Sequence, residues 1–337
     1  METLAFSDLI IDKTKDGTKL PTNDYQKIGS TAIIDQGQEF IAGYTDRSEG
    51  IFTDVPVIIF GDHTRVFKYI DFPFFLGADG VKILKANREV NYRYLYYYFL
   101  QAKFPNTGYA RHFKWLKELQ IPLPPLAEQK HITAILDKTQ KIIAEHKQML
   151  QKYDTLIKSR FIEMFGDNNF QKKKWNEIFI TKTGKLDSNA MVEDGEYPFF
   201  TCAKEVFKID KYAFDQEALL LAGNNAAGKY DVKHYKGKFN AYQRTYVLSL
   251  KEEWEYPLFK YQLEDKLEYL RQQSLGGLTK YLTLKILETL DFIVPPIELQ
   301  KEFSTFVQQI DKSKFAVQKS LEKTETLYKS LMQQYFA

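Results

Sequence analysis

The stretch IPLPPLAEQKHITAILD, residues 121–137, places a Pro-Pro pair before Gln-Lys and an apolar segment with helical spacing. A second stretch, IVPPIELQKEFSTFVQ, residues 293–308, repeats the same order of residues. A shift of 171 positions, the difference between 124 and 295, brings Pro124 onto Pro295. An internal repeat is stronger evidence for the fold of a chain than any single motif.

The match extends well beyond the prolines. With the same shift and no gap, Gln129 falls on Gln300, and about 40 residues later Phe165 falls on Phe336. Identities at both ends of so long an ungapped match are not expected by chance. The sequence is therefore a tandem of two halves, each a globular stretch followed by a helix.

The segments after the two Pro-Pro pairs have the period of long helices. Alternating steps of four and three residues from Ile132 to Met164 meet seven apolar or aromatic residues in ten, and the steps from Phe303 to Tyr335 meet eight in ten. A 3.5-residue period over about five heptads is typical of a coiled coil. At about 1.5 Å per residue, 40 residues form a rod of roughly 60 Å.

An apolar stripe of this length needs a partner that covers it. Because the two helices occur in one chain, we expect them to pair with each other as an antiparallel coiled coil. The stripe also contains polar residues, which are expected to fix the register because a buried polar side chain tolerates fewer pairings than leucine does. They are Thr139, His146, Lys314 and Thr324. A coiled coil between two copies of the chain is the alternative.

The globular stretches mix strands and helices. Short apolar runs bounded by Gly, Asp or charged residues predict strands, and longer runs with helical spacing predict helices. The predicted fold class is α+β, with two mixed α/β domains joined by the long helices and related by a pseudo-two-fold repeat. The predicted strands cover residues 55–60, 81–84, 218–223 and 245–250, and the predicted helices cover 91–100 and 258–270.

Length and composition suit two domains in a reducing compartment. The 337 residues contain a single cysteine, Cys202, which cannot form an internal disulfide. The first residues do not form a secretory signal, and no run of 18 apolar residues predicts a membrane span. We therefore expect a cytoplasmic protein.

The charge balance does not by itself predict a nucleic-acid-binding protein. Residues 1–120 contain 15 basic and 15 acidic side chains, and residues 167–292 contain 19 of each. Any contact with a polyanion must therefore come from local clusters. One such cluster, KYDVKHYKGKFNAYQR from Lys229 to Arg244, contains five cations against the single carboxylate of Asp231.

Searches for catalytic motifs find none that fits. GNNAAGK, residues 223–229, lacks the spacing of a nucleotide-binding P-loop, and no G-x-G-x-x-G opens a helix. Leu123 and Val294 precede the Pro-Pro pairs, where a base-methylating site needs Asn or Asp. The five histidines show no metal-ligand spacing, and Cys202 has no neighbouring base. We therefore expect a chain without a catalytic site or a bound metal of its own.

The repeated junction, the two long helices and their order resemble the specificity (S) subunit of type I restriction-modification enzymes. The resemblance rests on IPLPPLAEQKHITAILDKTQKII, residues 121–143, and on its second copy from Ile293. The second copy departs from the pattern because Glu298-Leu299 replaces Ala127-Glu128. The resemblance implies target-recognition domains at residues 1–122 and 167–293 and conserved spacer helices at residues 123–166 and 294–337.

The resemblance also implies a function and partners. Each target-recognition domain is expected to read one half of a bipartite, asymmetric sequence in double-stranded DNA, and the helices are expected to set the spacing. Two methylation subunits would dock on the helices and bind S-adenosylmethionine. Restriction subunits would use ATP and Mg²⁺. This chain would hold none of these cofactors itself.

Candidate DNA-contacting residues follow from side-chain chemistry. Arg pairs with guanine and Asn or Gln with adenine in the major groove, while Lys and Tyr contact phosphate or stack on bases. The candidates in the first domain are Asp62, His63, Arg65, Lys68, Tyr109, Arg111 and Lys114; in the second they are Asn224, Asn225, Lys229, Lys233, His234, Gln243, Arg244, Lys280 and Tyr281.

Two other classes of function remain open from the sequence. A coiled-coil scaffold that binds only protein would show no sequence preference on DNA, even with methylation subunits present. An autonomous nuclease or methyltransferase would act alone, given a metal or a methyl donor.

Overall fold

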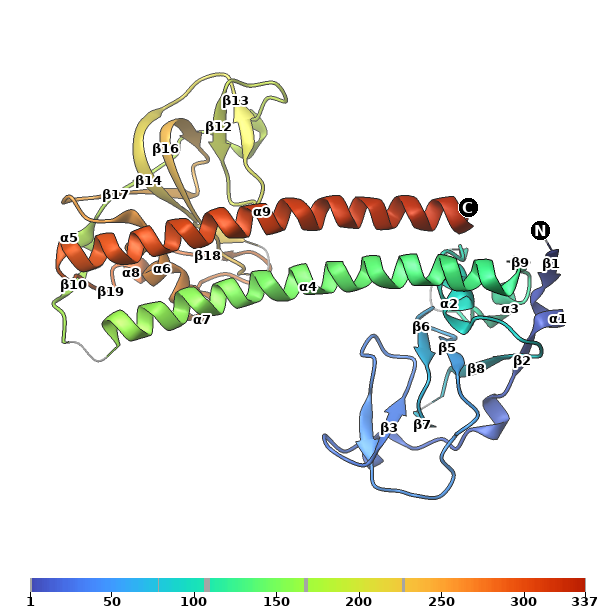
Figure 1. Cartoon of the computed structure of the whole chain (residues 1–337). Coiled ribbons are helices and arrows are strands. Elements are labelled where there is room, and N and C mark those ends of the chain that lie inside the picture. Colours follow the sequence, from blue (N-terminus) through green and yellow to red (C-terminus); the bar gives the residue numbers. More distant parts are fainter. Residues whose placement is uncertain (1, 78, 106–109, 167–168, 226–227, 337) are drawn as a thin grey trace. The chain divides into compact units, whose positions relative to one another are not determined.

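The computed structural model describes residues 2–77, 79–105, 110–166, 169–225 and 228–336. The chain forms two compact units, one of residues 1–147 with 319–337 and one of residues 148–318. Each unit combines one globular part with portions of two long helices, which Figure 1 labels α4 and α9.

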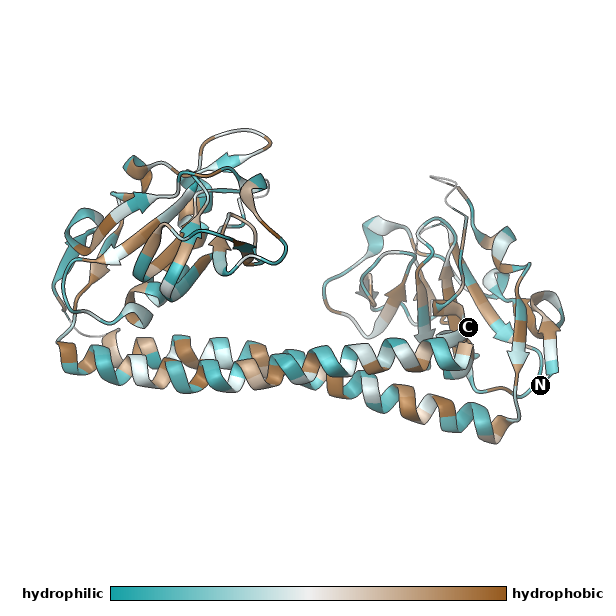
Figure 2. Ribbon diagram, turned by 90° about the horizontal axis from the view of Figure 1, so that it is seen from above, coloured by the Kyte–Doolittle hydropathy of each residue, from teal (hydrophilic) through white to brown (hydrophobic). Residues whose placement is uncertain are grey.

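The long helices begin at the Pro-Pro pairs, as predicted. Helix α4 spans Leu126–Phe165 and helix α9 spans Ile297–Phe336, 40 residues each. The carbonyl oxygen of Pro125 accepts the backbone N–H of Gln129 at 3.0 Å, and that of Pro296 accepts the N–H of Gln300 at 3.1 Å. Because proline has a preset φ and no N–H to satisfy, it suits the start of a helix. Hydrophobic and hydrophilic residues alternate along both helices in Figure 2.

In the first unit, the beginning of α4 packs against the end of α9. The Gln140 side chain donates to the Tyr328 hydroxyl at 2.8 Å, and Lys147 pairs with Glu325 at 2.9 Å. The residue number on α9 falls as that on α4 rises, so the helices run antiparallel in this unit.

The second unit repeats this arrangement with the other halves of the helices. The Lys314 ammonium lies 2.6 Å from Asp154, and Arg160 pairs with Glu302 at 2.6 Å. Apolar contacts accompany the ion pairs, since Ile157 belongs to the core of this unit. The helices of one chain thus pair with each other within each unit, in the antiparallel sense that the repeat predicted.

The polar residues in the apolar stripes of the two helices differ in their hydrogen-bond partners. Lys314 makes a contact between the helices, whereas Thr139 and Thr324 donate to the carbonyl oxygens four residues earlier on their own helices. A hydroxyl that bonds within its own helix gives no information about register. Of the hydrogen bonds and ion pairs described for these positions, that of Lys314 alone joins the two helices.

The first globular part contains three small sheets and short helices. The sheets have the orders β1-β9, β2-β8-β5-β6 and β4-β3-β7; β3 and β7 are parallel, and the other neighbours are antiparallel. Its elements are β1 (Glu2–Ala5), α1 (Phe6–Leu9), β2 (Ile10–Asp12), η1 (Thr14–Asp16), η2 (Thr22–Asp24), β3 (Thr31–Ile34), β4 (Gly43–Thr45), β5 (Val57–Gly61), β6 (Phe67–Ile70), β7 (Phe74–Leu76), β8 (Val81–Ala86), α2 (Tyr92–Leu100), α3 (Phe113–Leu116) and β9 (Gln120–Leu123).

The second globular part repeats this plan around a larger sheet. Its sheets have the orders β10-β19, β11-β17-β14-β16-β12-β13 and β15-β18, with β12 and β16 parallel. Its elements are β10 (Lys172–Lys174), α5 (Trp175–Ile178), β11 (Phe179–Thr183), η3 (Ser188–Ala190), β12 (Tyr197–Phe200), β13 (Phe207–Ile209), β14 (Phe214–Ala222), β15 (Asn224–Asn225), β16 (Val232–Ala241), β17 (Thr245–Leu250), α6 (Tyr256–Asp265), α7 (Leu267–Gln273), β18 (Lys280–Tyr281), α8 (Leu284–Leu287) and β19 (Asp291–Ile293).

In both parts the first strand pairs with the last. Strand β1 pairs antiparallel with β9, and β10 pairs antiparallel with β19. Strand β9 leads directly into its Pro-Pro pair, and one residue, Val294, separates β19 from the second pair, so the closure of each globular part fixes the start of its long helix. The two globular parts therefore close in the same way, as expected for two halves of a tandem chain.

The predicted elements are present, with one exception. Strands β5, β8 and β14 overlap the predicted strands with shifted ends, β17 matches its predicted strand, and α2 (Tyr92–Leu100) lies within the helix predicted for residues 91–100. The helix predicted for residues 258–270 was wrong as a single element, because α6 ends before Lys266 and α7 starts after it. The chain bends there (Lys266 φ −91°, ψ −2°), and Leu270 beyond the bend is buried in the core of the second unit.

Candidate nucleic-acid interface

The junction glutamine of the first unit joins the globular part to the long helix. Gln129 is buried. Its Nε2 donates to the Pro124 carbonyl at 2.8 Å, and its Oε1 accepts the backbone N–H of Asn91, the residue before α2, at 2.9 Å. One side chain thereby bridges the Pro-Pro junction and the N-terminus of α2.

The second unit repeats this bridge. Gln300 Nε2 donates to the Pro295 carbonyl at 2.8 Å, and its Oε1 accepts the backbone N–H of Glu255, the residue before α6, at 3.1 Å. The repeat gave the positions of these glutamines but not their partners, because Asn91 and Glu255 lie about 40 residues earlier in the chain.

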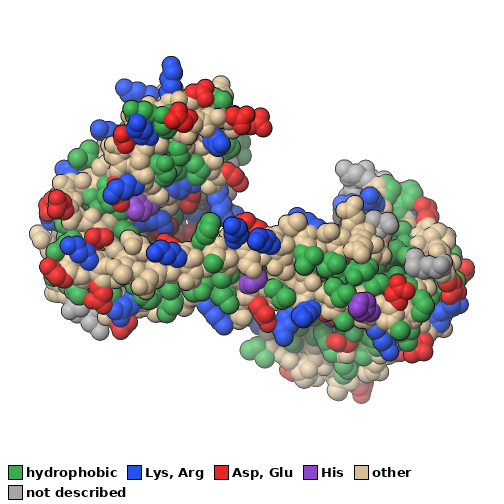
Figure 3. Space-filling view, turned by 45° about the horizontal axis from the view of Figure 1, so that its top comes forward, with side chains coloured by type: hydrophobic (Ala, Val, Ile, Leu, Met, Phe, Trp, Pro, Cys, Tyr) green, Lys and Arg blue, Asp and Glu red, His purple; other side chains and the backbone are tan. Residues whose placement is uncertain are grey.

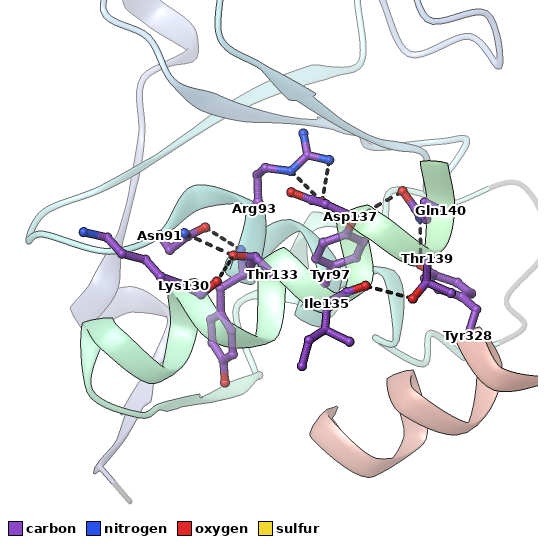
Figure 4. Close-up of polar contacts among 11 residues, drawn as sticks. Asn91, Arg93, Tyr97, Lys130, Thr133, Ile135, Asp137, Thr139, Gln140 and Tyr328 are labelled. Atoms are coloured by element: carbon purple, nitrogen blue, oxygen red, sulfur yellow. Dashed lines mark hydrogen bonds and ion pairs between the residues drawn. The ribbon is translucent and has the colours of Figure 1, made fainter. Parts of the chain in front are cut away.

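The first unit adds a polar network between α2, α4 and α9. Figure 4 shows Arg93 and Tyr97 of α2 directed toward Asp137 of α4, and Gln140 of α4 toward Tyr328 of α9. Arg93 Nε donates to Asp137 at 2.8 Å, and the Tyr97 hydroxyl also donates to Asp137. Burial is the largest cause of the raised pKa of Tyr97, and its bond to Asp137 raises that pKa further. Tyr97 therefore stays a neutral donor and helps to hold the globular part on α4.

Two candidate loops of the first unit meet through Asp62. Its carboxylate accepts the backbone N–H of Phe113 at 2.7 Å, and its carbonyl oxygen accepts the N–H of His112 at 2.9 Å. The loop after β5 and the segment before α3 therefore lie together, although 50 residues separate them. Asp62 itself is buried, and its carboxylate is occupied by this contact.

Lys68 lies inside the first unit. Its side chain is only 3% exposed, its ammonium donates to the carbonyl oxygen of Glu39, and it lies 3.6 Å from Asp35. Burial lowers the pKa of Lys68, and Asp35 opposes this effect. A cation held in this way cannot reach DNA without rearrangement, so Lys68 is excluded from the interface that we propose.

The remaining candidates of the first unit lie closer to the surface. Arg65, Arg111 and Lys114 are exposed, and His63 is half-buried. Arg65 has a φ of +61° at the turn between β5 and β6. Tyr109 lies outside the described residues.

Lys19 and Gln36 lie near these loops, although nothing in their local sequence indicates it. Asp79 pairs with Lys19 at 2.7 Å, and its pKa is lowered first by Lys19 and more weakly by the charge of Arg111. The Gln36 amide donates to the Asp79 carbonyl at 2.9 Å, and the Gln36 carbonyl accepts the Thr64 hydroxyl at 2.6 Å. Lys19 and Gln36 are therefore neighbours of the candidate loops, which the sequence could not show because they are distant along the chain.

The second unit brings its amide and cationic candidates together on a two-stranded ladder. Asn224 pairs with Tyr281, and Asn225 pairs with Lys280, across β15 and β18. The Asn225 side chain also accepts the backbone N–H of the exposed Lys229 at 3.2 Å. Five predicted residues from two distant segments thus form one surface.

The turn that contains Arg244 joins this surface through a glycine. Gly223 donates its N–H to the Arg244 carbonyl at 2.8 Å, and a Cβ on Gly223 would lie only 2.3 Å from that oxygen. The close approach requires glycine at this position. The Arg244 and Gln243 residues themselves are exposed. The backbone of Arg244 serves the fold, and its side chain remains available.

Lys233 and His234 are less available than their neighbours. Lys233 pairs with Asp231 and donates to the Ala203 carbonyl at 2.9 Å. His234 lies 2.9 Å from Glu217, and its ring stacks on that of Tyr256 with centroids 5.3 Å apart. Both side chains have partners within the unit, which their place in a basic stretch did not reveal.

A shallow pocket of about 470 Å³ adjoins Asn224. Tyr242 contributes to it from the turn before Arg244, and Thr201 and Cys202 contribute from the segment after β12. Cys202 Sγ lies 3.4 Å from the Arg244 carbonyl. The lining is mixed, with apolar side chains such as Phe207 beside polar ones such as Asn224 and Thr201, and these polar groups can form hydrogen bonds with base edges.

The surface carries both signs of charge. In the face shown in Figure 3, Lys and Arg side chains are interspersed with Asp and Glu side chains. The described residues contain no group of three His, Cys, Asp or Glu that could hold a metal ion, and none of the described helices is long and apolar enough to cross a membrane. The arrangement favours recognition through a few local contacts over capture by a large basic patch.

Comparison with protein families decides the affiliation. The model of the family described as "Type I restriction modification DNA specificity domain" matches residues 10–152 and again residues 167–325. The chain belongs to this family. Each match covers most of one globular part and much of the long helix that follows it. The two matches therefore correspond to the two halves of the internal repeat.

Individual specificity subunits are similar to parts of the chain. The EcoDI specificity subunit of Escherichia coli is 38% identical over 145 residues, which are 41% of this chain and 31% of that protein. The EcoR124I/EcoR124II specificity subunit of E. coli is 26% identical over 209 residues, 56% of this chain and 47% of that protein. The chain thus spans a third to a half of the length of these relatives.

A solved specificity subunit has the same fold. The S subunit of a type I restriction-modification system from M. genitalium superposes with a TM-score of 0.71 at 18% identity, covering 100% of this chain and 96% of that chain. This similarity confirms the predicted fold class of two mixed domains with two long helices.

Proposed function

We propose that this chain is the DNA-recognition subunit of a type I restriction-modification complex. Each globular part, residues 1–122 and 167–293, reads one half of a bipartite DNA target. The observation that carries the proposal is that two specificity domains of different sequence each gather exposed cations or amides from distant segments onto one surface. Two different readers imply an asymmetric target.

The proposed readers are candidates whose side chains are exposed or half-buried. In the first domain they are the arginines of the two loops that Asp62 joins, Arg65 and Arg111. In the second they are Asn224 and Asn225 on their ladder and Arg244 beside it. Arg suits guanine and Asn suits adenine in the major groove, while exposed lysines such as Lys229 suit phosphate.

The long helices are proposed to set spacing and to dock two methylation subunits. Exposed apolar side chains on both helices support docking, among them Leu156 on α4 and Phe315 on α9, which is 71% exposed. S-adenosylmethionine, ATP and Mg²⁺ belong to the partner subunits in this proposal. The chain would contribute recognition and no catalysis.

The proposal is tested by coexpressing the chain with its cognate methylation subunits and mapping the methylated adenines. The expected result is methylation confined to one sequence with two half-sites and a fixed spacer. Exchange of residues 167–293 for those of another specificity subunit should change one half-site and leave the other. No sequence preference, with stable assembly, would favour a protein-binding scaffold instead.

A further inference from the structure

A leucine projects from the second globular part with almost no protein around it. Leu278 is 95% exposed, whereas most other exposed large apolar side chains among the described residues retain 37–56% exposure. The exceptions besides Leu278 are Phe315, on the proposed docking surface, and Ile28, at 86%. Single exposed apolar side chains are common, so the surroundings of Leu278 must show whether it has a role.

The turn that carries Leu278 has a defined shape. Leu275 and Tyr281 exchange backbone hydrogen bonds of 3.0 and 2.9 Å, which close the hairpin below the tip. At the tip, Gly276 has a φ of +97°, and a Cβ there would lie 2.3 Å from the carbonyl oxygen of Thr279. Since only glycine fits this position, the turn is built to hold its shape.

A cation braces the same turn. The Lys280 ammonium donates to the Gly276 carbonyl at 2.9 Å. Gly277 has no atom within 4 Å of the place where a Cβ would be, so the tip is open on the side next to Leu278. The hairpin therefore holds its leucine away from the protein and does not fold it back onto the surface.

The surroundings of the hairpin are polar and basic. Its second strand, β18, pairs with β15, which contributes Asn224 and Asn225. The backbone N–H of the exposed Lys229 donates to the Asn225 side chain, and Lys280 lies in the hairpin itself. A surface of amides and ammonium groups complements the bases and phosphates of DNA. Leu275 and Tyr281 of the same hairpin are also exposed, at 47% and 37%, so the tip presents apolar side chains beside these polar groups.

Leucine has a known use on DNA-binding surfaces. Proteins that bind the minor groove read it with Arg, Lys, Asn or Gln and insert Leu, Ile, Met, Phe or Pro between base steps, which unstacks the bases and kinks the duplex. The cost of the unstacking varies with the step, so the insertion also discriminates between sequences. Transfer of an exposed leucine side chain out of water offsets part of that cost.

We propose that Leu278 inserts as an apolar wedge between two base pairs of the half-site that the second recognition domain reads. The proposal rests on the proposed function of the chain. It assigns the hairpin of residues 275–281 a part in recognition through DNA deformation, beside direct contacts from Asn224, Asn225 and Arg244.

The test uses the complex of the full chain with its methylation subunits and the target found by methylation mapping. 2-Aminopurine is placed at successive positions of each half-site, outside the methylated adenines. The wild-type complex should raise the fluorescence at one step of one half-site. Leu278→Ala should remove that signal and weaken specific binding about tenfold, with little change on non-specific DNA.

Rescue and a matched control sharpen the test. Leu278→Met should retain the signal, and an abasic site at the affected step should restore the affinity of Leu278→Ala, because no stacking remains to be broken. Ile28→Ala, a similarly exposed aliphatic in the first domain, should keep the signal and the affinity. An equal loss in Ile28→Ala would contradict the wedge.

Two further outcomes separate this proposal from the proposed function. If the wild-type complex has a sequence preference and Leu278→Ala keeps both signal and affinity, the wedge alone is wrong. If Leu278→Ala weakens assembly with the methylation subunits in the absence of DNA, the leucine contacts protein, and the wedge is again wrong. A wild-type complex without sequence preference overturns the proposed function itself.

Discussion

The Gln129 side chain donates to the carbonyl oxygen of Pro124 at 2.8 Å, and 171 residues later Gln300 makes the same contact with Pro295. In each case the other end of the amide accepts the backbone N–H of the residue before a helix of the globular part. The feature that the two junctions share is therefore a buried amide that holds a globular part on its long helix.

Gln300→Ala should destabilise the second unit. The substitution removes two hydrogen bonds and leaves the N–H of Glu255 and the carbonyl of Pro295 without partners, which costs about 2–3 kcal/mol in the free energy of unfolding. Urea denaturation followed by circular dichroism measures this loss. Gln308→Ala, an exposed glutamine on the same helix, is the control and should change the free energy by less than about 0.5 kcal/mol.

Arg244→Ala should weaken recognition at one base position. Its backbone carbonyl, which the substitution keeps, makes the structural contact with Gly223, so the fold should be retained. Loss of a bidentate contact to a base costs about 1–3 kcal/mol and relaxes the preference at that position. Binding to a panel of single-base variants of the target measures the effect. A uniform loss on all sequences would instead indicate a phosphate contact.

Lys68→Met should leave DNA affinity unchanged. The Lys68 side chain is buried, and its ammonium contacts the Glu39 carbonyl and Asp35. The substitution removes one partner of the pair and leaves the Asp35 carboxylate without its cation, so the thermal midpoint should fall while the DNA contacts remain. Affinity for the mapped target and the thermal midpoint are the measurements, with Arg65→Ala as the contrasting variant that should bind less well. A large loss of affinity in Lys68→Met would return this residue to the interface.

The same lysine should give stability a dependence on alkaline pH. Burial lowers the pKa of Lys68 below its usual value of 10.5. Between the lowered pKa and 10.5 the unfolded state binds more protons than the folded state, so the free energy of unfolding rises with pH in this window. Urea denaturation at several alkaline pH values should show a smaller rise in Lys68→Met. Equal slopes in both proteins would contradict a lowered pKa.

The length of the helices should set the spacer of the DNA target. Seven residues inserted between Lys147 and Gln148, and seven between Gln318 and Lys319, fall at the borders of the two units and keep the heptad period. Each insertion adds about 10 Å of helix, which corresponds to roughly three base pairs. Methylation mapping should find a longer spacer with unchanged half-sites. An unchanged spacer would refute the role of the helices as a ruler.

The local structure, that is the long helices and the main strands, was predicted well from the sequence. Proline pairs, heptad spacing and short apolar runs depend on neighbouring residues, so the helices and the main strands followed from them. The single helix predicted over residues 258–270 failed because the bend at Lys266 accompanies the burial of Leu270, which the core decides.

For the candidate site, by contrast, the sequence did not predict which side chains are available to DNA. Asp62 and Lys68 have the chemistry of DNA contacts, but their partners, Phe113 and Glu39, lie 51 and 29 residues away along the chain. Lys233 lies in a basic stretch, yet Asp231 and the Ala203 carbonyl occupy its ammonium. Burial and pairing of this kind depend on contacts between distant segments, which no local pattern contains.

By itself, the sequence determined that this protein is a tandem with two long helices, because a repeat and a period are properties of residue order. Tertiary structure alone decided that Gln129 and Gln300 bridge each junction to a helix, that Lys68 faces inward and that Leu278 stands free in solvent. The physical reason is that hydrogen bonding and exposure depend on which distant segments meet when the chain closes.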